Sequence, residues 1–237
     1  MSDGSVRHGT LAEAAAETGA CIPVEKSAHY LKFYEELLGS RRDAPLRIVE
    51  LGIHRGGSTI LFARYFHAAR ILSVDIRKPP RALYKWLRKN AADNRVSVAI
   101  GSQDDPRFLR TAIEAHFGAG PVDVVFDDAS HVYGPTQASY ETLFYERLRP
   151  GGWYCIEDWG CGYWPAWADG HPDGRHGLPR FVKERIDEVA MSDRTKEYHG
   201  ARALPVGREQ ASPIARLLIV PGIVAIKKAP GARSQED

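Results

Sequence analysis

The 237-residue sequence contains little cysteine and no large excess of either charge. Its three cysteines, Cys21, Cys155 and Cys161, follow no metal-binding repeat, and 32 Lys and Arg residues stand against 30 Asp and Glu. No apolar run approaches the roughly 20 residues that span a bilayer, and residues 1–10 lack the apolar stretch of a signal peptide. We therefore expect a reduced, cytoplasmic protein that binds neither nucleic acid nor a membrane.

The rest of the sequence alternates short apolar runs with amphipathic segments. The apolar runs predict strands at 46–53, 69–76, 95–102, 122–128 and 152–159. Helical periodicity predicts helices at 11–18, 26–40, 58–69, 81–92, 105–118, 136–148 and 180–191. Continuously apolar strands that alternate with helices are typical of a parallel sheet covered on both faces. We predict one α/β domain over 1–237, with a helical or flexible segment at 1–25, two final strands that turn at Pro221 and Gly222, and a polar tail at 230–237.

Polar residues follow the first two predicted strands, at the edge where such a sheet binds ligands. The first strand runs into a glycine-rich turn between Glu50 and Ser58, and the helix after it offers free N–H groups. Asp75 ends the second strand about 20 residues later, a spacing typical of an acid that accepts hydrogen bonds from ribose hydroxyls. The turn does not match G-x-G-x-x-G, and a purely structural strand-to-helix turn is the alternative.

The third predicted strand is also followed by polar residues: Ser102, Gln103, Asp104 and Asp105. Their side chains suit the edge of an adenine ring. Either aspartate could equally cap the next helix, because Asp is a favoured N-cap residue.

Four carboxylates and a histidine lie at the ends of the fourth and fifth predicted strands, namely Asp127, Asp128 and His131 at one and Glu157 and Asp158 at the other. These strand ends are neighbours in such a sheet, and burying so much negative charge together is costly unless a cation neutralises it. Oxygen ligands favour a hard divalent ion, with Mg²⁺ first and Mn²⁺ or Ca²⁺ behind it. The alternatives are a helix-capping role for Asp127 or Asp128 and a structural role for His131.

Residues 159–179 interrupt the alternation with a loop dense in Gly, Pro, Trp and His. Trp159, Trp164 and Trp167 argue against disorder and indicate a segment that packs over something. Because aromatic faces can stack on the apolar surface of a ligand, we interpret the loop as a candidate acceptor lid. A surface flap packed for stability is the alternative.

Several motifs occur together in the order of a known family: E-L-G-I-H-R-G-G-S at 50–58, D-D-A-S-H at 127–131 and R-P-G-G-W-Y-C-I-E-D at 149–158. They resemble class I S-adenosylmethionine-dependent methyltransferases. More narrowly, they resemble the metal-dependent sugar O-methyltransferases of macrolide-sugar and mycobacterial methylmannose polysaccharide biosynthesis. The segment K-S-A-H-Y-L-K-F-Y-E at 26–35 is similar to the K-x-x-H-x-Y-x-x-x-Y-E segment of that family, except that here a tyrosine directly follows His29.

The resemblance implies a Rossmann-like doubly wound sheet, mostly parallel with an antiparallel C-terminal strand, and it implies a role for each matching residue. The residues implied to contact S-adenosylmethionine are Glu50, Gly52, Gly56, Gly57, Ser58, Asp75, Ser102, Gln103, Asp104 and Asp127. Those implied to bind Mg²⁺ are Asp128, Glu157 and Asp158, and His131 is the implied general base. Spacing alone does not decide which of Asp127 and Asp128 faces the metal, and the choice of Asp128 follows the family.

The sequence analysis therefore predicts an S-adenosylmethionine- and Mg²⁺-dependent O-methyltransferase acting on a sugar hydroxyl, such as that of a mannoside or rhamnoside. The acceptor would be a small molecule or an oligosaccharide, in polysaccharide or glycosylated natural-product biosynthesis, and a homo-oligomer is left open. One alternative is an O-methyltransferase of a catechol or phenol. The other is a non-catalytic protein that binds S-adenosylmethionine.

Overall fold

The computed structural model describes residues 9–191 and 212–231. Within this part of the chain the strands are β1 Arg47–Leu51, β2 Arg70–Asp75, β3 Val96–Ile100, β4 Val122–Asp127, β5 Leu148–Glu157, β6 Ile214–Val220 and β7 Ile223–Lys228. The α-helices are α1 Leu11–Gly19, α2 Ala28–Leu38, α3 Gly57–Tyr65, α4 Arg81–Lys89, α5 Pro106–Phe117, α6 Tyr133–Tyr140 and α7 Gly177–Met191. Shorter helical segments are η1 Gly39–Arg41, the π-helical η2 Glu141–Arg147 and η3 Trp159–Tyr163.

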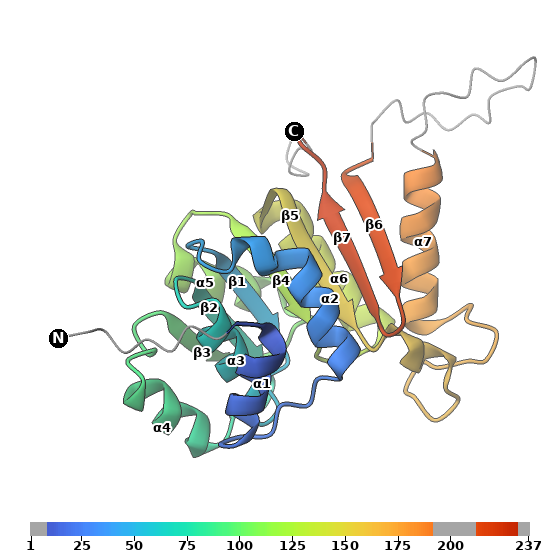
Figure 1. Cartoon of the computed structure of the whole chain (residues 1–237). Coiled ribbons are helices and arrows are strands. Elements are labelled where there is room, and N and C mark those ends of the chain that lie inside the picture. Colours follow the sequence, from blue (N-terminus) through green and yellow to red (C-terminus); the bar gives the residue numbers. More distant parts are fainter. Residues whose placement is uncertain (1–8, 192–211, 232–237) are drawn as a thin grey trace, which may run out of the picture.

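The described strands form one seven-stranded sheet in the order β3-β2-β1-β4-β5-β7-β6 (Figure 1). Strands β1 to β5 pair in parallel, whereas β7 runs antiparallel to both β5 and β6. The predicted mostly parallel sheet with an antiparallel C-terminal strand is thus confirmed. The strand order reverses between β1 and β4, so the carboxyl ends of these two strands lie side by side at the switch point where such sheets bind ligands.

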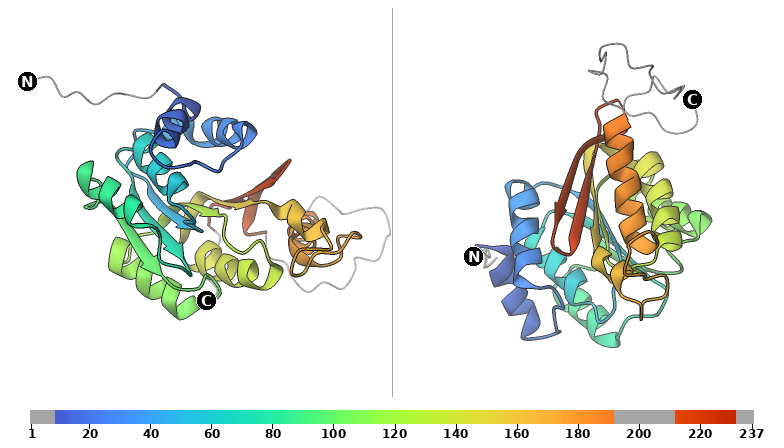
Figure 2. Two further views of the ribbon diagram at one scale, coloured as in Figure 1. Left: turned by 90° about the horizontal axis from the view of Figure 1, so that it is seen from below. Right: turned by 90° about the vertical axis from the view of Figure 1, so that its right-hand side faces the viewer.

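Helices cover both faces of the sheet, as the two views of Figure 2 show. One hydrophobic cluster packs α1, α2, α3 and α4 against one face, and a second packs α5, α6, η2 and α7 against the other. Successive residues of a strand point to opposite faces, so Ile48 of β1 belongs to the first cluster and Val49 to the second. Burial on both faces explains why the strands are continuously apolar in sequence.

The structure differs from the sequence prediction between β4 and β5. The predicted helix 136–148 begins three residues earlier, at Tyr133, and becomes π-helical after Tyr140. Strand β5 begins at Leu148 rather than 152, because Leu148 already pairs with Val122 of β4. The next pair is Val124 with Trp153, so residues 149–152 form an irregularity in the strand. Gly151 has a φ of 75°, a left-handed conformation that glycine adopts without steric cost.

Two expectations fall at the ends of the described chain. Residues 1–8 of the segment expected at 1–25 and residues 232–237 of the polar tail expected at 230–237 lie outside the described residues. A capping box formed by Thr10 and Glu13 starts α1. Among residues 9–191 and 212–231, no helix has the length and hydrophobicity of a membrane span.

Candidate active site

A cavity of about 660 Å³ lies at the carboxyl ends of β1 to β4. Of the residues singled out from the sequence, its lining includes Gly52, Asp75, Ser102, Gln103, Asp104 and Asp128. A second cavity of about 280 Å³ is lined by Gly57, Ser58, His131 and Asp158, among others. Both cavities share Gly52 and Asp128, so they adjoin at the switch point between β1 and β4.

The carboxylate of Asp75 organises the turn after β1. One of its oxygens, Oδ2, accepts hydrogen bonds from the main-chain N–H groups of Ile53 and His54, each at 2.9 Å. The other oxygen accepts the N–H of Arg77 at 2.8 Å. Asp75 therefore joins the ends of β1 and β2 while it lines the larger cavity.

The glycines of the turn are required by close backbone contacts. A Cβ on Gly52 would lie 2.1 Å from the main-chain oxygen of Asp128, and one on Gly57 would lie 2.0 Å from that of Pro23. Gly56 is the N-cap of α3 with a φ of 89°, and a Cβ there would press on Leu83. The glycine-rich turn thus lets the chain after β4 and the segment before α2 approach closely.

Glu50 lies buried beneath this turn, with 1% of its surface exposed. Its Oε2 accepts the hydroxyl hydrogens of Thr59 and Ser73, both at 2.6 Å. Its Oε1 has no hydrogen-bond partner among the described residues. Burial raises the pKa of the Glu50 carboxyl, and the hydroxyl hydrogen bonds oppose this rise.

Gln103, Asp104 and Asp105, which follow β3, have three different roles. Asp105 caps α5 by accepting the N–H groups of Arg107 and Phe108, which leaves Asp104 to line the cavity. Gln103 is 7% exposed and directs its amide inward. Its Nε2 lies 3.2 Å from Asp127 Oδ1, and its Oε1 accepts the N–H of Ser130 at 2.9 Å. The functional groups of Gln103 therefore fix the turn after β4 from behind the cavity.

Asp127 and Asp128 point to different places, as expected of neighbours at a strand end. Asp127 is 2% exposed, does not line either cavity, and accepts the hydroxyls of Tyr154 at 2.8 Å and Ser139 at 3.2 Å. Burial raises its pKa to about 6, while the hydrogen bond from Tyr154 opposes the rise. The structure therefore places Asp127 behind the larger cavity, whereas Asp128 lines both cavities.

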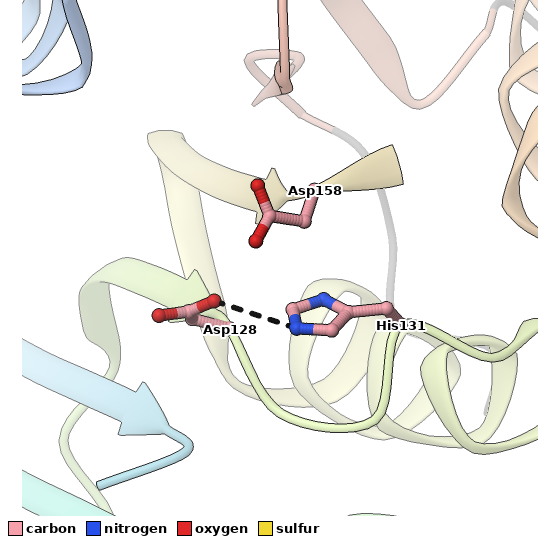
Figure 3. Close-up of side chains that lie close together, drawn as sticks. All are labelled: Asp128, His131 and Asp158. Carbon is pink, nitrogen blue, oxygen red and sulfur yellow. Dashed lines mark ion pairs between the residues drawn. The ribbon is translucent and has the colours of Figure 1, made fainter. Parts of the chain in front are cut away.

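Asp128, His131 and Asp158 form a cluster at the edge of the smaller cavity (Figure 3). One ligand atom from each residue lies within 4.8 Å of the others, and His131 Nε2 is 3.7 Å from Asp128 Oδ1. His131 Nδ1 lies 3.3 Å from the main-chain oxygen of Glu157. A proton on Nδ1 would be donated to that carbonyl, which would leave Nε2 as the basic nitrogen.

The backbone at this cluster is strained. Of the four non-glycine residues with positive φ in the described chain, His54, His131 and Asp158 all line the smaller cavity, with φ values of 48°, 52° and 52°. Such conformations cost of order 1–3 kcal/mol each and persist where surrounding contacts hold them. Their concentration at one cavity marks this edge of the sheet as the functional site.

Glu157 lies beside the cluster but has other partners. It is 1% exposed, and its Oε1 accepts the hydroxyl of Tyr34 at 2.8 Å. Its Oε2 lies 2.7 Å from Nζ of Lys26, which is also 2.7 Å from Asp128 Oδ2. Burial raises the pKa of Glu157, and the Lys26 charge opposes the rise. The structure thus does not bring Glu157 into the same cluster as Asp128, His131 and Asp158.

Sequence reasoning gave no role to Lys26, although it quoted the segment that contains it. The side chain is 3% exposed and is the ammonium group found between the two carboxylates. Burial lowers the pKa of Lys26, but the charges of Glu157 and Asp128 outweigh that effect and raise it above its ordinary value. From the same segment, Tyr30 donates its hydroxyl to Asp158. The sequence analysis considered only a metal ion as the cation beside these strand-end acids, and the structure adds a lysine ammonium group.

The cluster fits Mg²⁺ by its donor set. Mg²⁺ is commonly held by one or two carboxylates with water completing its six ligands, and Asp128 and Asp158 supply two carboxylates 4.8 Å or less apart. Glu157 can join them only through an oxygen already engaged with Lys26 or Tyr34. The larger cavity also fits a nucleoside, because Ile76 at its wall is 68% exposed and offers an apolar surface beside the polar groups.

Known proteins share this sequence pattern. A family model described as a methyltransferase domain matches residues 49–159. L-olivosyl-oleandolide 3-O-methyltransferase from Streptomyces antibioticus is 34% identical over 197 residues, covering 78% of this chain and 45% of that protein. The 8-demethyl-8-alpha-L-rhamnosyl tetracenomycin-C 2'-O-methyltransferase from Streptomyces olivaceus is 32% identical, covering 67% of this chain and 40% of that protein. The chain spans less than half the length of these two relatives.

Solved structures share the fold. MycE methyltransferase from the mycinamycin biosynthetic pathway, in complex with Mg and SAH, matches with a TM-score of 0.73 and 23% identity over 97% of this chain and 56% of that chain. The strand order and the strand-end cavity are those of the Rossmann-like methyltransferase fold. The chain therefore has the class I S-adenosylmethionine-dependent methyltransferase fold, and in sequence it resembles the macrolide and deoxysugar O-methyltransferases.

Proposed function

We propose that this chain transfers the methyl group of S-adenosylmethionine to a sugar hydroxyl of a glycosylated natural product, with Mg²⁺ bound and His131 as the general base. The observation that carries the proposal is the cluster of Asp128, His131 and Asp158 where the two cavities adjoin. By their names, the two relatives described above are O-methyltransferases of an olivosyl and a rhamnosyl compound. This supports a deoxysugar glycoside as the acceptor class.

S-adenosylmethionine would occupy the larger cavity. Asp75 would accept the ribose hydroxyls, and Ser102 and Asp104 would border the adenine. Gly52 and Ser58 would contact the amino-acid end at the entrance to the smaller cavity. The methyl group would then lie near Asp128, between the nucleoside and the cluster.

Asp128 and Asp158 would hold Mg²⁺, with Glu157 as a further ligand if one of its oxygens is shared. When bound, the ion supplies positive charge that makes the acceptor hydroxyl more acidic. His131 Nε2 accepts the hydroxyl proton as the oxygen forms its bond to the methyl carbon and the carbon–sulfur bond breaks. The electron pair of the broken carbon–sulfur bond stays on sulfur and cancels its positive charge. The thioether product is therefore neutral and leaves without needing a proton.

We place the acceptor sugar against the loop 159–179. Trp164 is 58% exposed and Tyr163 is 36% exposed, so both offer aromatic faces to a ligand. The loop borders the cluster, because the Trp167 ring centroid lies 5.8 Å from that of His131. Trp164→Ala is expected to raise the acceptor KM and leave the affinity for S-adenosylmethionine unchanged.

The test is transfer of labelled methyl from S-adenosylmethionine to rhamnosides, olivosides, mannosides and catechols, each with MgCl₂ and with excess EDTA. Labelling of a deoxysugar glycoside that EDTA abolishes is the expected result. Labelling that survives EDTA would contradict the role of Mg²⁺ and leave the carboxylates as structural partners of Lys26. Labelling of catechols alone would contradict the sugar acceptor, and binding without transfer to any acceptor would contradict the enzymatic proposal.

A further inference from the structure

The loop 159–179 forms two hydrogen bonds to the turn that carries His131. The indole N–H of Trp167 donates to the main-chain carbonyl of His131, with 3.0 Å between Nε1 and O. Two residues further on, Oδ2 of Asp169 accepts the main-chain N–H of Tyr133 at 2.8 Å. The chain after β5 thereby closes on the chain after β4 on both sides of Val132.

The backbone at this turn requires such support. His131 has a φ of 52°, a left-handed conformation that is unfavourable for a non-glycine residue. Val132 is the N-cap of α6 and makes no side-chain capping bond, so Asp169 accepts an N–H that the start of the helix leaves unpaired. The Trp167 ring also lies beside the imidazole, tilted by 47°.

We propose that Trp167 and Asp169 are positioning residues that hold the His131 imidazole in the orientation in which Nε2 faces the acceptor. The loop that would contact the acceptor is therefore the same element that fixes the base. Acceptor binding against this loop would tighten the two hydrogen bonds and order His131 for proton transfer. This inference rests on the proposed role of His131.

Three variants separate these hydrogen bonds from general packing. Trp167→Phe keeps an aromatic ring but removes the indole N–H. Asp169→Ala removes the carboxylate oxygen that accepts the Tyr133 N–H, whereas Asp169→Asn keeps a side-chain oxygen that can accept it. Trp86→Phe is the matched control, because Trp86 of α4 packs against Arg64 of α3 and lines neither cavity. Losing one such hydrogen bond is expected to lower kcat about tenfold in the first two variants. Asp169→Asn and Trp86→Phe are expected to stay within about twofold of wild type.

Two further measurements distinguish positioning from unfolding. The dissociation constant for S-adenosylmethionine, measured by calorimetry, is expected to be unchanged in all variants. In protein labelled with ¹³C-histidine, the ring signal missing from His131→Ala identifies His131. That signal is expected to broaden or shift in Asp169→Ala, in which no aromatic ring is altered, and to return to its wild-type position in Asp169→Asn.

Failure of this inference can be distinguished from failure of the proposed function in the methyl-transfer assay. Wild-type kcat and an unchanged His131 signal in both Trp167→Phe and Asp169→Ala would overturn the inference. A loss of cofactor affinity parallel to the loss of kcat would also overturn it, because the loop would then support the whole fold. A perturbed His131 signal in a protein that methylates no acceptor would uphold the two-point attachment and refute the proposed function.

Discussion

Lys26 and Glu157, 131 residues apart in sequence, form a buried ion pair with 2.7 Å between Nζ and Oε2. The same ammonium group lies 2.7 Å from Asp128, so one lysine pairs with carboxylates from the ends of two strands. The segment before α2 reaches them because Gly57 leaves room for Pro23 to cross the start of α3. The N-terminal segment is therefore part of the site.

Replacing Lys26 by Met should destabilise the protein and make it more dependent on Mg²⁺. Removing one partner of a buried ion pair costs roughly 3–5 kcal/mol, because the remaining carboxylates lose the charge that offset their burial. A divalent ion can replace that compensation, so the rise in melting temperature from EDTA to MgCl₂ should be larger in Lys26→Met than in wild type. Lys32→Met is the control, because Lys32 is 79% exposed and 3.9 Å from Glu36. Equal stability of the two variants in EDTA would contradict the prediction.

His131→Ala should reduce methyl transfer far more than cofactor binding. A positioned general base contributes typically 10² to 10⁴-fold to the rate, whereas S-adenosylmethionine would lie mainly in the larger cavity, which His131 does not line. We expect kcat to fall within that range and the cofactor dissociation constant to stay within about twofold. His67→Ala is the control, since His67 is 53% exposed and paired with Asp43. Wild-type turnover in His131→Ala would place the base elsewhere.

Gly57→Ala should weaken both the fold and cofactor binding. The new Cβ would lie 2.0 Å from the main-chain oxygen of Pro23, so either α3 or the segment before α2 must move. We expect a loss of about 1–3 kcal/mol in unfolding free energy and weaker binding of S-adenosylhomocysteine. Gly134→Ala is the matched control, because it lies in α6 and its Cβ would meet nothing within 4 Å. There alanine should be neutral or stabilising by up to about 1 kcal/mol. Similar melting temperatures for the two variants would refute the expected clash.

Asp123 should make stability depend on pH at the acidic end. Burial would raise its pKa, but hydrogen bonds from Arg41 and the Arg47 N–H, together with the charge of Arg149, outweigh burial and lower it. A lowered pKa in the folded state stabilises above the unfolded-state pKa of about 3.9, and this contribution is lost as pH falls through the folded value. Asp123→Asn should therefore cost about 1–3 kcal/mol at pH 7 and progressively less below about pH 4. Denaturant titrations at pH 7 and below about pH 4 test this. Asp93→Asn is the control, because Asp93 is exposed. A difference that does not change with pH would contradict it.

The sequence predicted the sheet because a strand buried on both faces has a local signature. The apolar runs at β1, β2 and β4 are continuous, and each ends in polar residues that the parallel topology brings to one edge. For the same reason Asp128 and Asp158, from different strands, could be expected together. The boundary between α6 and β5 was not predictable, because the π-helical turn and the strand irregularity depend on packing between elements.

The side-chain directions at the site could not be read in the same way. Asp104 and Asp105 are both plausible caps in sequence, and the observed start of α5 selects Asp105. Gln103 points inward because Asp127 and Ser130 offer it partners behind the cavity. Such choices depend on hydrogen bonds between groups that are far apart in the chain.

By itself, the sequence determined the α/β architecture, the glycine-rich turn after β1, Asp75 at the end of β2, and the set of acids at the ends of β4 and β5, because these follow from local periodicity and a regular topology. Only the tertiary structure decided that Asp128 rather than Asp127 enters the site, that Lys26 lies between Asp128 and Glu157, and that Trp167 is fastened to His131. Buried charges must find partners wherever the fold brings donors close, and no local pattern encodes which distant residue that will be.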